Sequence, residues 1–343
     1  MRLLIIDYIT YFGHRNFNKI HVESLIRQGH TIHVVGRYSA LSSIDNNEKL
    51  KFTYLPGWSN RSFPVSSVSE RLKNVALLFW IKRKFVIQDY DLVIFLAYDI
   101  FSLCFHRSDT PTILINHNNV SQLGSRIKLY LTKHLSGNYT HVVLTEETRI
   151  QLRNLLGKDS VKYVPHGFVY DKGEAVKPKY LNEGERFIFC PINSNYDAEQ
   201  VTNLFSSSGF LELLEKKNLL LVTKSNLVGS VKFQHIVSLS KRIPEEEYRY
   251  LLRNAVAVIL PYSNAFKYRC SGILFECISA NTPVIATQIE ALDMYRDLIQ
   301  IKFFRNVSEF VDNIRYFLNT TRTKVDNTVF VPDNYWEQIL NEI

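Results

Sequence analysis

The sequence predicts an α/β protein built from two doubly wound parallel sheets. Short apolar runs of strand length alternate with helix-like segments along the whole chain, which is typical of parallel βα units. A charged stretch at 166–185, with three glycines and one proline, separates one such series from another. At 343 residues the chain is long enough for two domains, each with its own core.

The first series of strands occupies the N-terminal half. The helix before the second strand is predicted to end at Gly29, a residue type that favours helix ends. Ser66–Gln88 predicts one long helix or two broken ones, and Glu146–Leu156 predicts another. The strands are predicted at Leu3–Ile6, Thr31–Val35, Phe52–Leu55, Leu92–Leu96, Thr112–Asn116, His141–Leu144 and Val161–Pro165.

A second series follows the charged stretch. Glu245–Asn254 predicts a helix, with Pro244 at its first turn, where proline is tolerated. Because ligands of such domains sit at the carboxyl ends of the strands, two of them joined by one linker predict a cleft. The strands are predicted at Phe187–Cys190, Leu219–Thr223, His235–Leu239, Val256–Leu260, Pro283–Ala286 and Ile299–Phe303.

Positive charge is concentrated in the first half of the chain. Residues 1–170 carry 21 Lys and Arg against 12 Asp and Glu, whereas residues 171–343 carry 20 against 21. This asymmetry favours an anionic partner for the N-terminal half: a membrane surface, a lipid-linked phosphate acceptor or nucleic acid. Nucleic acid is disfavoured, because no RNA- or DNA-binding motif accompanies the charge.

Cysteine usage and hydropathy favour a cytoplasmic protein. The four cysteines show no metal-ligand spacing, and nothing in the sequence demands disulfides. The apolar start Leu3–Ile6 is broken by Asp7, which is too short for a signal peptide. The longest other apolar run, Val75–Ile81, is too short to cross a bilayer.

The most informative stretch is 259–287, ILPYSNAFKYRCSGILFECISANTPVIAT. A strand is followed by a polar loop and a helix start, whose free backbone N–H groups and dipole form an anion site in outline. An ordinary βαβ unit with a solvated arginine and a surface glutamate explains the spacing equally well. The residues with binding chemistry here are Lys267, Arg269, Ser271, Gly272 and Glu276.

This stretch resembles the donor-binding signature of GT-B nucleotide-sugar glycosyltransferases of the glycosyl transferases group 1 family. Where that family usually has a second glutamate, eight positions before the first, this chain has Tyr268. The resemblance continues elsewhere in family order, at Gly29–Val35, Val161–Phe168 and Asn334–Ile343. The matching pieces of the signature are Ser271-Gly272, Glu276 and Pro283-Val284-Ile285-Ala286.

The resemblance implies a GT-B fold, with two Rossmann-like domains facing each other across a cleft. It assigns an acceptor-binding domain to 1–168, a linker to 169–185, a donor-binding domain to 186–332, and a helix that crosses back to 333–343. It also implies transfer of a sugar from a nucleoside-diphosphate donor, a UDP-sugar being favoured, to an acceptor. Neither a metal nor a cofactor is expected, because the nucleotide-sugar is a substrate.

The basic N-terminal half favours a lipid-linked glycan acceptor, as in bacterial surface polysaccharide synthesis. A peripheral position on the inner face of the cell membrane would follow. Two alternatives share the fold. One is a nucleotide-sugar 2-epimerase, which needs no acceptor. The other is a catalytically degenerate subunit that binds or scaffolds.

Two loops of the first domain hold candidate residues. His117 follows the carboxyl end of a predicted strand, where polar residues often line a cleft, and histidine handles protons near neutral pH. Similar proteins place a histidine near the transferred sugar, so His117 is the expected catalytic residue, with His14 and His166 as rivals. Gly13 would let the backbone approach a diphosphate. The plain alternative for His117 is a structural histidine whose ring bonds to the backbone. The plain alternative for the loop with Gly13 is an ordinary turn.

The resemblance implies that cations hold the donor diphosphate. The family's usual arginine after the first strand of the second domain is missing, since 191–195 contains none. Arg269, also assigned as catalytic, and Lys267 are expected to replace it, helped by Lys224 and by Ser194 as a neutral donor. Asp89-Tyr90-Asp91 resembles a metal-binding pattern but precedes a strand, away from the cleft, and GT-B enzymes use cations and helix N-termini instead.

Two basic segments have apolar centres. Basic amphipathic helices suit an anionic membrane or acceptor surface, and a core-packed helix with a solvated face is the alternative. In the first segment the apolar centre is Leu77–Ile81. The basic residues assigned to this surface are Arg71, Lys73, Lys82, Arg83, Lys84, Arg126 and Lys128.

Overall fold

The chain folds as two compact units. Unit 1 contains Met1–Phe168 and Phe330–Ile343, and unit 2 contains Val169–Val329. The computed structural model describes residues 1–11, 14–64, 67–106, 108–117, 120, 123–135, 139–157, 161–167, 173–192, 198–224, 233–239, 243–266, 269–293, 295–296, 299–323 and 332–343.

Unit 1 is built on a seven-stranded parallel sheet in the order β3-β2-β1-β4-β5-β6-β7. Every strand predicted in the first half is present. The strands are β1 (Arg2–Asp7), β2 (Thr31–Gly36), β3 (Leu50–Tyr54), β4 (Leu92–Ala97), β5 (Thr112–Asn116), β6 (Thr140–Val143) and β7 (Val161–Tyr163). The helices are α1 (Arg15–Arg27), α2 (Tyr38–Leu41), α3 (Val68–Lys84), α4 (Ile100–Leu103), α5 (Arg126–Leu135), α6 (Glu146–Leu156) and α13 (Asp333–Asn341).

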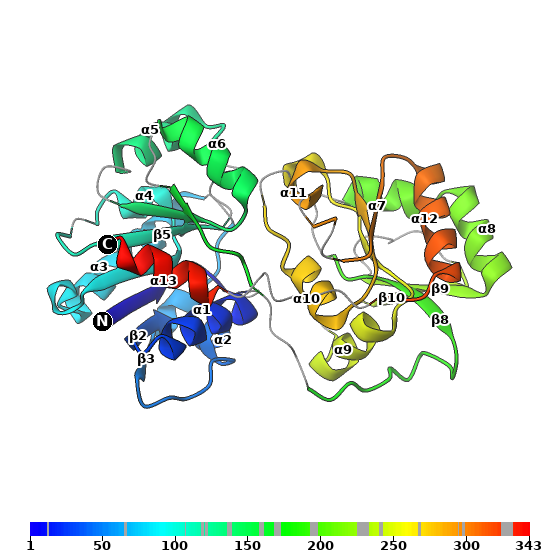
Figure 1. Cartoon of the computed structure of the whole chain (residues 1–343), viewed down its shortest axis with the longest axis horizontal. Coiled ribbons are helices and arrows are strands. Elements are labelled where there is room, and N and C mark those ends of the chain that lie inside the picture. Colours follow the sequence, from blue (N-terminus) through cyan, green and yellow to red (C-terminus); the bar gives the residue numbers. More distant parts are fainter. Residues whose placement is uncertain are drawn as a thin grey trace. The chain divides into compact units, whose positions relative to one another are not determined.

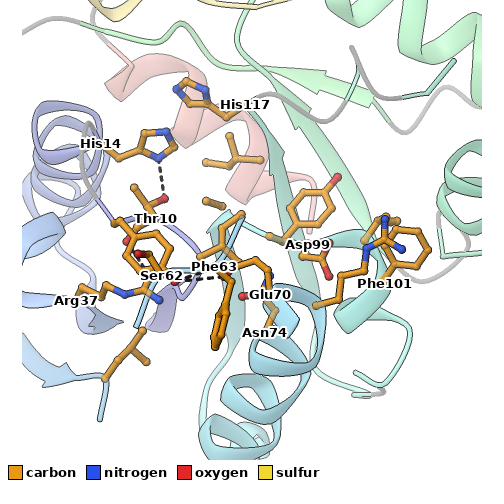
Figure 2. Close-up of a pocket in the computed structure, with 18 of the residues that line it drawn as sticks. Thr10, His14, Arg37, Ser62, Phe63, Glu70, Asn74, Asp99, Phe101 and His117 are labelled. Atoms are coloured by element: carbon orange, nitrogen blue, oxygen red, sulfur yellow. Dashed lines mark hydrogen bonds between the residues drawn. The ribbon is translucent and has the colours of Figure 1, made fainter. Parts of the chain in front are cut away.

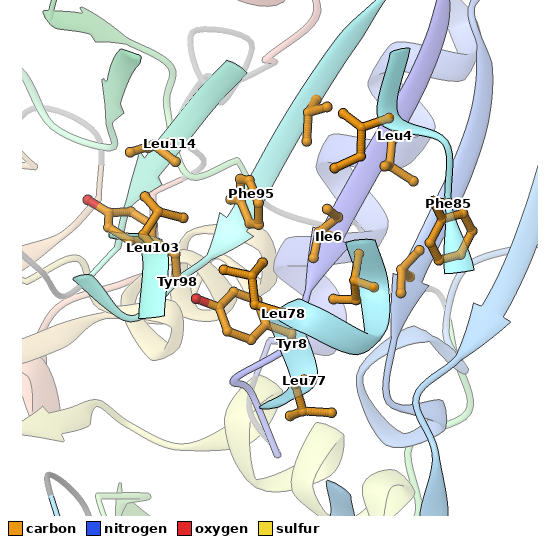
Figure 3. Close-up of a cluster of buried hydrophobic side chains, with 14 of the residues drawn as sticks. Leu4, Ile6, Tyr8, Leu77, Leu78, Phe85, Phe95, Tyr98, Leu103 and Leu114 are labelled. Atoms are coloured by element: carbon orange, nitrogen blue, oxygen red, sulfur yellow. The ribbon is translucent and has the colours of Figure 1, made fainter. Parts of the chain in front are cut away.

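Helix α3 packs its apolar residues into the core of unit 1 (Figure 3). Leu77, Leu78 and Ile81 are buried against β1 and β4, so most of the predicted amphipathic centre Leu77–Ile81 faces the core rather than a membrane. The helix begins at Val68 because Ser67 Oγ accepts the Glu70 backbone N–H at 3.2 Å. The core-packed alternative is therefore correct for this part of α3.

Helix α13 belongs to unit 1 and lies beside α1 (Figure 1). The indole N–H of Trp336 donates to His21 Nδ1 at 3.0 Å, and both side chains are fully buried. At the helix start, Asp333 pairs with Arg27, with 2.8 Å between carboxylate oxygen and guanidinium nitrogen. These contacts join two segments more than three hundred positions apart.

Unit 2 is built on a six-stranded parallel sheet in the order β10-β9-β8-β11-β12-β13. All the strands predicted in the second half are present, with ends shifted by one or two residues. The strands are β8 (Arg186–Cys190), β9 (Leu219–Lys224), β10 (Ile236–Leu239), β11 (Val258–Leu260), β12 (Val284–Thr287) and β13 (Ile301–Phe304). The helices are α7 (Ala198–Phe205), α8 (Ser208–Lys217), α9 (Glu245–Asn254), α10 (Gly272–Ala280), α11 (Glu290–Asp293) and α12 (Val307–Asn319). None of the helices described in either unit is both long and apolar enough to cross a membrane.

Candidate functional site

Each sheet reverses its winding direction between two neighbouring strands. In unit 1 the chain builds outward from β1 through β2 to β3, and β4 then pairs with the other side of β1. In unit 2 the same reversal separates β8 from β11. Ligands of doubly wound sheets bind outside the carboxyl ends of the strands at such a reversal. Each unit therefore has one region that qualifies as a candidate site.

Unit 1 has a cavity of about 1050 Å³ at its reversal point. Its walls come from the loop after β1, the turn after β4, and helices α3 and α5. Figure 2 shows Thr10 and His14 on the loop after β1, Asp99 after β4, and Glu70 and Asn74 on α3. This volume is at the upper end of the range for small-molecule sites.

His117 lies in the wall of this cavity, directly after β5 (Figure 2). Its ring stacks on that of His14, with 4.3 Å between the ring centroids. The ring of Phe17 meets His117 edge-on at 5.0 Å, and the ring of His166 lies 5.5 Å away. The fold thus brings all three candidate histidines, His117, His14 and His166, into contact around the ring of Phe17.

Burial favours the neutral form of two of these imidazoles. It lowers the pKa of His166 to about 4, although the donation from His166 Nδ1 to the Gly167 carbonyl at 3.0 Å acts in the opposite direction. Burial also lowers the pKa of His14, against the raising effect of the Asp7 carboxylate. At pH 7 these two imidazoles are therefore uncharged, and each can accept a hydrogen bond.

Lys73 does not belong to a surface, which corrects its assignment. Its side chain is only 4% exposed, and its ammonium lies 2.7 Å from Glu70 Oε2. The Tyr11 ring covers the same ammonium at 4.4 Å. Because Glu70 lies one helical turn earlier on α3, the two charges neutralise each other inside the protein.

Arg37 is a buried cavity residue that the sequence analysis did not select. Its guanidinium donates to the backbone carbonyls of Tyr8 at 3.1 Å, Thr10 at 2.8 Å and Ser59 at 3.0 Å. These bonds tie the loop after β1 to the segment after β3. The role of Arg37 is therefore to shape the cavity.

Arg71 and Lys128 line the cavity, whereas the other predicted basic residues lie elsewhere. Lys82 Nζ lies 3.4 Å from the Phe105 carbonyl, and Lys84 Nζ lies 5.7 Å from the centre of the Trp80 ring. Arg83 and Arg126 are exposed on α3 and α5. The assignment of these residues to a membrane or acceptor surface stays a prediction.

In unit 2 the candidate site lies between the end of β11 and the start of α10. Ser271 caps the helix: its Oγ accepts the Leu274 N–H at 3.1 Å and lies 2.7 Å from the Tyr262 hydroxyl. Ser271 is only 2% exposed, so its hydroxyl does not face a ligand. This corrects the predicted donor role of Ser271. The backbone N–H groups of Gly272 and Ile273 have no hydrogen-bond partner among the described residues. Such a helix start attracts anions.

Arg269 and Lys224 lie at the carboxyl edge of the unit 2 sheet. Arg269 is half-buried two residues before the helix cap, and its backbone N–H donates to the Phe266 carbonyl at 2.9 Å. Lys224 is the last residue of β9, which pairs with β8. Their proposed contacts with a diphosphate stay predictions.

Glu276 has a partner that the sequence did not indicate. Tyr248 on α9 donates its hydroxyl to Glu276 Oε2 at 2.6 Å, and both side chains are half-buried. Burial raises the pKa of Tyr248 well above its ordinary value, and the Glu276 carboxylate adds to this shift. The phenol therefore remains a donor at neutral pH and orients the carboxylate.

No family model and no curated protein matches the chain. Solved structures do match over almost its whole length. The UDP-GlcNAc 2-epimerase from Methanocaldococcus jannaschii is 13% identical, with a TM-score of 0.61 and full coverage of both chains (100% each). A trehalose-6-phosphate structure from E. coli bound with UDP-2-fluoro glucose is 10% identical, with a TM-score of 0.67 over 100% of this chain and 98% of the other. WaaG, a glycosyltransferase involved in lipopolysaccharide biosynthesis, is 14% identical, with a TM-score of 0.60 over 98% and 93%.

The chain has the GT-B fold. The resemblance to GT-B glycosyltransferases that the signature stretch indicated is thereby confirmed at the level of structure. At identities this low the comparisons establish the architecture alone.

Some predicted GT-B site residues lie outside the described residues: Gly13, Ser194 and Lys267. Other residues were missed although their positions contained a signal. Asp99 follows the strand Leu92–Leu96 closely, just as His117 follows Thr112–Asn116. His117 was selected because polar residues after a strand's carboxyl end often line a cleft, and the same reasoning would have selected Asp99. Glu70 had no such signal, because its burial depends on Tyr11 from a distant segment.

Proposed function

We propose that this protein is a glycosyltransferase that moves a sugar from a nucleoside-diphosphate-sugar, a UDP-sugar being favoured, to an acceptor. The observation that carries the proposal is the open start of α10 at the reversal point of unit 2. Two backbone N–H groups without a partner among the described residues, a nearby arginine and an oriented glutamate occur there within eight residues, Arg269 to Glu276. This combination suits a diphosphate followed by a ribose.

The proposed chemistry needs no metal. As the bond between the anomeric carbon and the diphosphate breaks, negative charge develops on the leaving diphosphate. Arg269, with Lys224 or Lys267, would stabilise that charge together with the dipole of α10. An acceptor hydroxyl would form the new bond and lose its proton to a neutral imidazole, for which we propose His117.

The acceptor is proposed to be a lipid-linked glycan, as in bacterial surface polysaccharide synthesis, reached from the inner face of the cell membrane. Part of α3 and α5 supports this: Leu72 is 64% exposed, Ile127 65% and Tyr130 69%. Exposed Arg83 and Arg126 lie on the same helices. Large exposed apolar side chains next to cations suit an anionic lipid surface.

Sedimentation with liposomes tests the membrane proposal by itself. Wild type should bind vesicles that contain anionic lipid at low salt, and Ile127→Ser with Tyr130→Ser should weaken binding about tenfold. Exchange of an exposed apolar residue of the other unit, Val176→Ser, is the matched control. Equal binding by all three proteins, or none by wild type, would refute the membrane role.

A nucleotide-sugar 2-epimerase is the alternative that a specific observation favours, since the M. jannaschii epimerase has the same fold. Product analysis separates the two enzymes, because an epimerase converts its nucleotide-sugar with no acceptor present. A degenerate subunit would turn over no donor at all.

Thermal stabilisation by UDP, GDP, ADP, CMP and TDP tests the donor site. We expect one nucleotide, UDP, to stabilise the wild type, and Arg269→Ala to abolish the shift. Arg296→Ala is the matched control, because this arginine of the same unit pairs with Asp293 on the protein surface at 2.7 Å. No stabilisation by any nucleotide would refute the donor site and favour a degenerate subunit.

A further inference from the structure

Five charged side chains among the described residues line the unit 1 cavity. Arg37 donates to three backbone carbonyls, and Glu70 is paired with Lys73. The remaining charged side chains of the lining are Arg71, Asp99 and Lys128. They give this wall two positive charges against one negative charge.

Arg71 and Lys128 come from different helices, α3 and α5, to the same wall. Burial lowers the pKa of Lys128, and the positive charge of Arg71 lowers it further, whereas Asp99 acts in the opposite direction. The fold thus brings two like charges to one cavity wall. An anion placed between them would relieve their repulsion.

The Arg71 guanidinium contacts an aromatic ring of the cavity wall. It lies over the Phe101 ring, with 4.0 Å between its central carbon and the ring centroid. A guanidinium over an aromatic face is stabilised by the ring, and its planar set of N–H groups matches the two oxygens of a carboxylate or phosphate. Asp99 Oδ2 accepts the Ser102 N–H at 2.9 Å, and Asp99 Oδ1 has no hydrogen-bond partner among the described residues.

The cavity also has features that suit a sugar ring. Tyr38 and Tyr54 line it with exposed rings, 67% and 47%, which meet edge-on at 5.4 Å. Exposed aromatic rings provide flat apolar surfaces for the C–H faces of a pyranose. On α3, one turn after Arg71, buried Asn74 has a side-chain oxygen with no partner among the described residues. This oxygen is a candidate acceptor for a sugar hydroxyl.

We propose that the unit 1 cavity binds an acidic sugar, one that carries a carboxylate or a phosphate, with its anionic group between Arg71 and Lys128. The free Asp99 oxygen then accepts from a neighbouring sugar hydroxyl. This inference rests on the proposed function in so far as the cavity is taken as the acceptor site. It narrows the acceptor to glycans whose terminal unit is acidic.

Calorimetric titration of the full-length protein with four probes tests the proposal: glucuronic acid, glucose 6-phosphate, glucose and inorganic phosphate. We expect at least one acidic sugar to bind about tenfold more tightly than glucose, because it adds charge-assisted hydrogen bonds. The two acidic sugars distinguish a carboxylate from a phosphate. Inorganic phosphate should bind weakly, since it lacks the sugar contacts.

The variants Arg71→Met and Lys128→Met should each reduce the preference for the acidic sugar, and the double variant should abolish it. Lys51→Met is the matched control, because this lysine is exposed on β3 of the same unit and does not line the cavity. Unchanged thermal unfolding would show that the variants fold. Equal binding of glucose and both acidic sugars, absence of binding by either acidic sugar, or a preference that survives in the double variant would overturn the proposal.

Stabilisation by UDP is measured in parallel, so that the proposed donor site and the proposed acidic-sugar site can be refuted independently. Loss of UDP stabilisation with acidic-sugar binding intact would refute the proposed donor site in unit 2 and leave the cavity assignment standing. UDP stabilisation without any preference for acidic sugars would refute the cavity assignment alone.

Discussion

Tyr248 donates its hydroxyl to Glu276 at 2.6 Å and so links α9 to α10 in unit 2. A carboxylate oriented in this way loses less rotamer freedom when it accepts hydroxyl groups from a ribose. We therefore consider Tyr248 a positioning residue for the proposed donor site.

Tyr248→Phe should weaken UDP binding by about fivefold to tenfold, the usual effect of one lost hydrogen bond. Because the effect is expected to act through the ribose, it should be smaller for 2′-deoxyuridine diphosphate. Titration of wild type and variant with both nucleotides measures this difference. An equal loss for both nucleotides would indicate general destabilisation of the site instead.

Gly167→Ala should destabilise unit 1 by roughly 2–4 kcal/mol. Gly167 has φ +72°, and a β-carbon there would lie 2.7 Å from Ile20 Cγ2. Gly157→Ala is the control, since Gly157 has φ +66° but no atom within 4 Å of such a carbon, so only the backbone cost of about 1 kcal/mol remains. Tryptophan fluorescence in urea measures both, because all three tryptophans (Trp58, Trp80, Trp336) lie in unit 1. Equal losses would contradict the steric argument.

Unit 1 should lose stability as the pH falls below 6.5, in part because of His21. Burial lowers the pKa of His21 to about 3 in the folded protein, and the positive charge that His166 would carry lowers it further. The unfolded chain binds this proton near pH 6.5 and the folded protein does not, so the free energy of unfolding decreases as the pH falls from 6.5 towards 3. The contribution between pH 7 and 4.5 is roughly 2 to 3 kcal/mol.

His21→Gln keeps an acceptor for the Trp336 indole but removes the titration. The variant should therefore show a smaller loss of stability between pH 7 and 4.5 than wild type, measured by the same fluorescence. A pH dependence identical to that of wild type would mean that His21 is not the group responsible.

His117→Gln should lower turnover by about 100-fold or more if its imidazole takes the acceptor proton. UDP stabilisation should be unchanged, because the proposed donor site lies in unit 2. His134→Gln, an exposed histidine on α5, is the control. Turnover close to wild type in His117→Gln would move the proposed base to His14 or His166.

The strand pattern was predictable because parallel strands buried on both faces are short apolar runs that are visible in the sequence. All the strands of both sheets were predicted, and the order of strands follows the usual doubly wound topology. The helix start at Gly272 was also predictable from the preceding serine, although this serine caps the helix rather than binds a ligand.

The details of the sites were less accessible to sequence reasoning. The burial of Lys73 depends on the Tyr11 ring, which arrives from the loop after β1. The contact between Tyr248 and Glu276 depends on the packing of two helices, separated by β11 along the chain. Pairs of this kind are created by tertiary structure and leave no local pattern.

The position of α13 has a consequence for biosynthesis. Residues 333–341 leave the ribosome only after all of unit 2 has been synthesised, yet Trp336 fills a fully buried place against α1. During translation, unit 2 can acquire its complete set of elements while unit 1 still exposes the apolar surface of α1 that awaits this helix. Unit 1 is thus translated first but completes its fold last. The place on α1 that Trp336 fills stays exposed while about 170 further residues are added, at 5–20 residues per second.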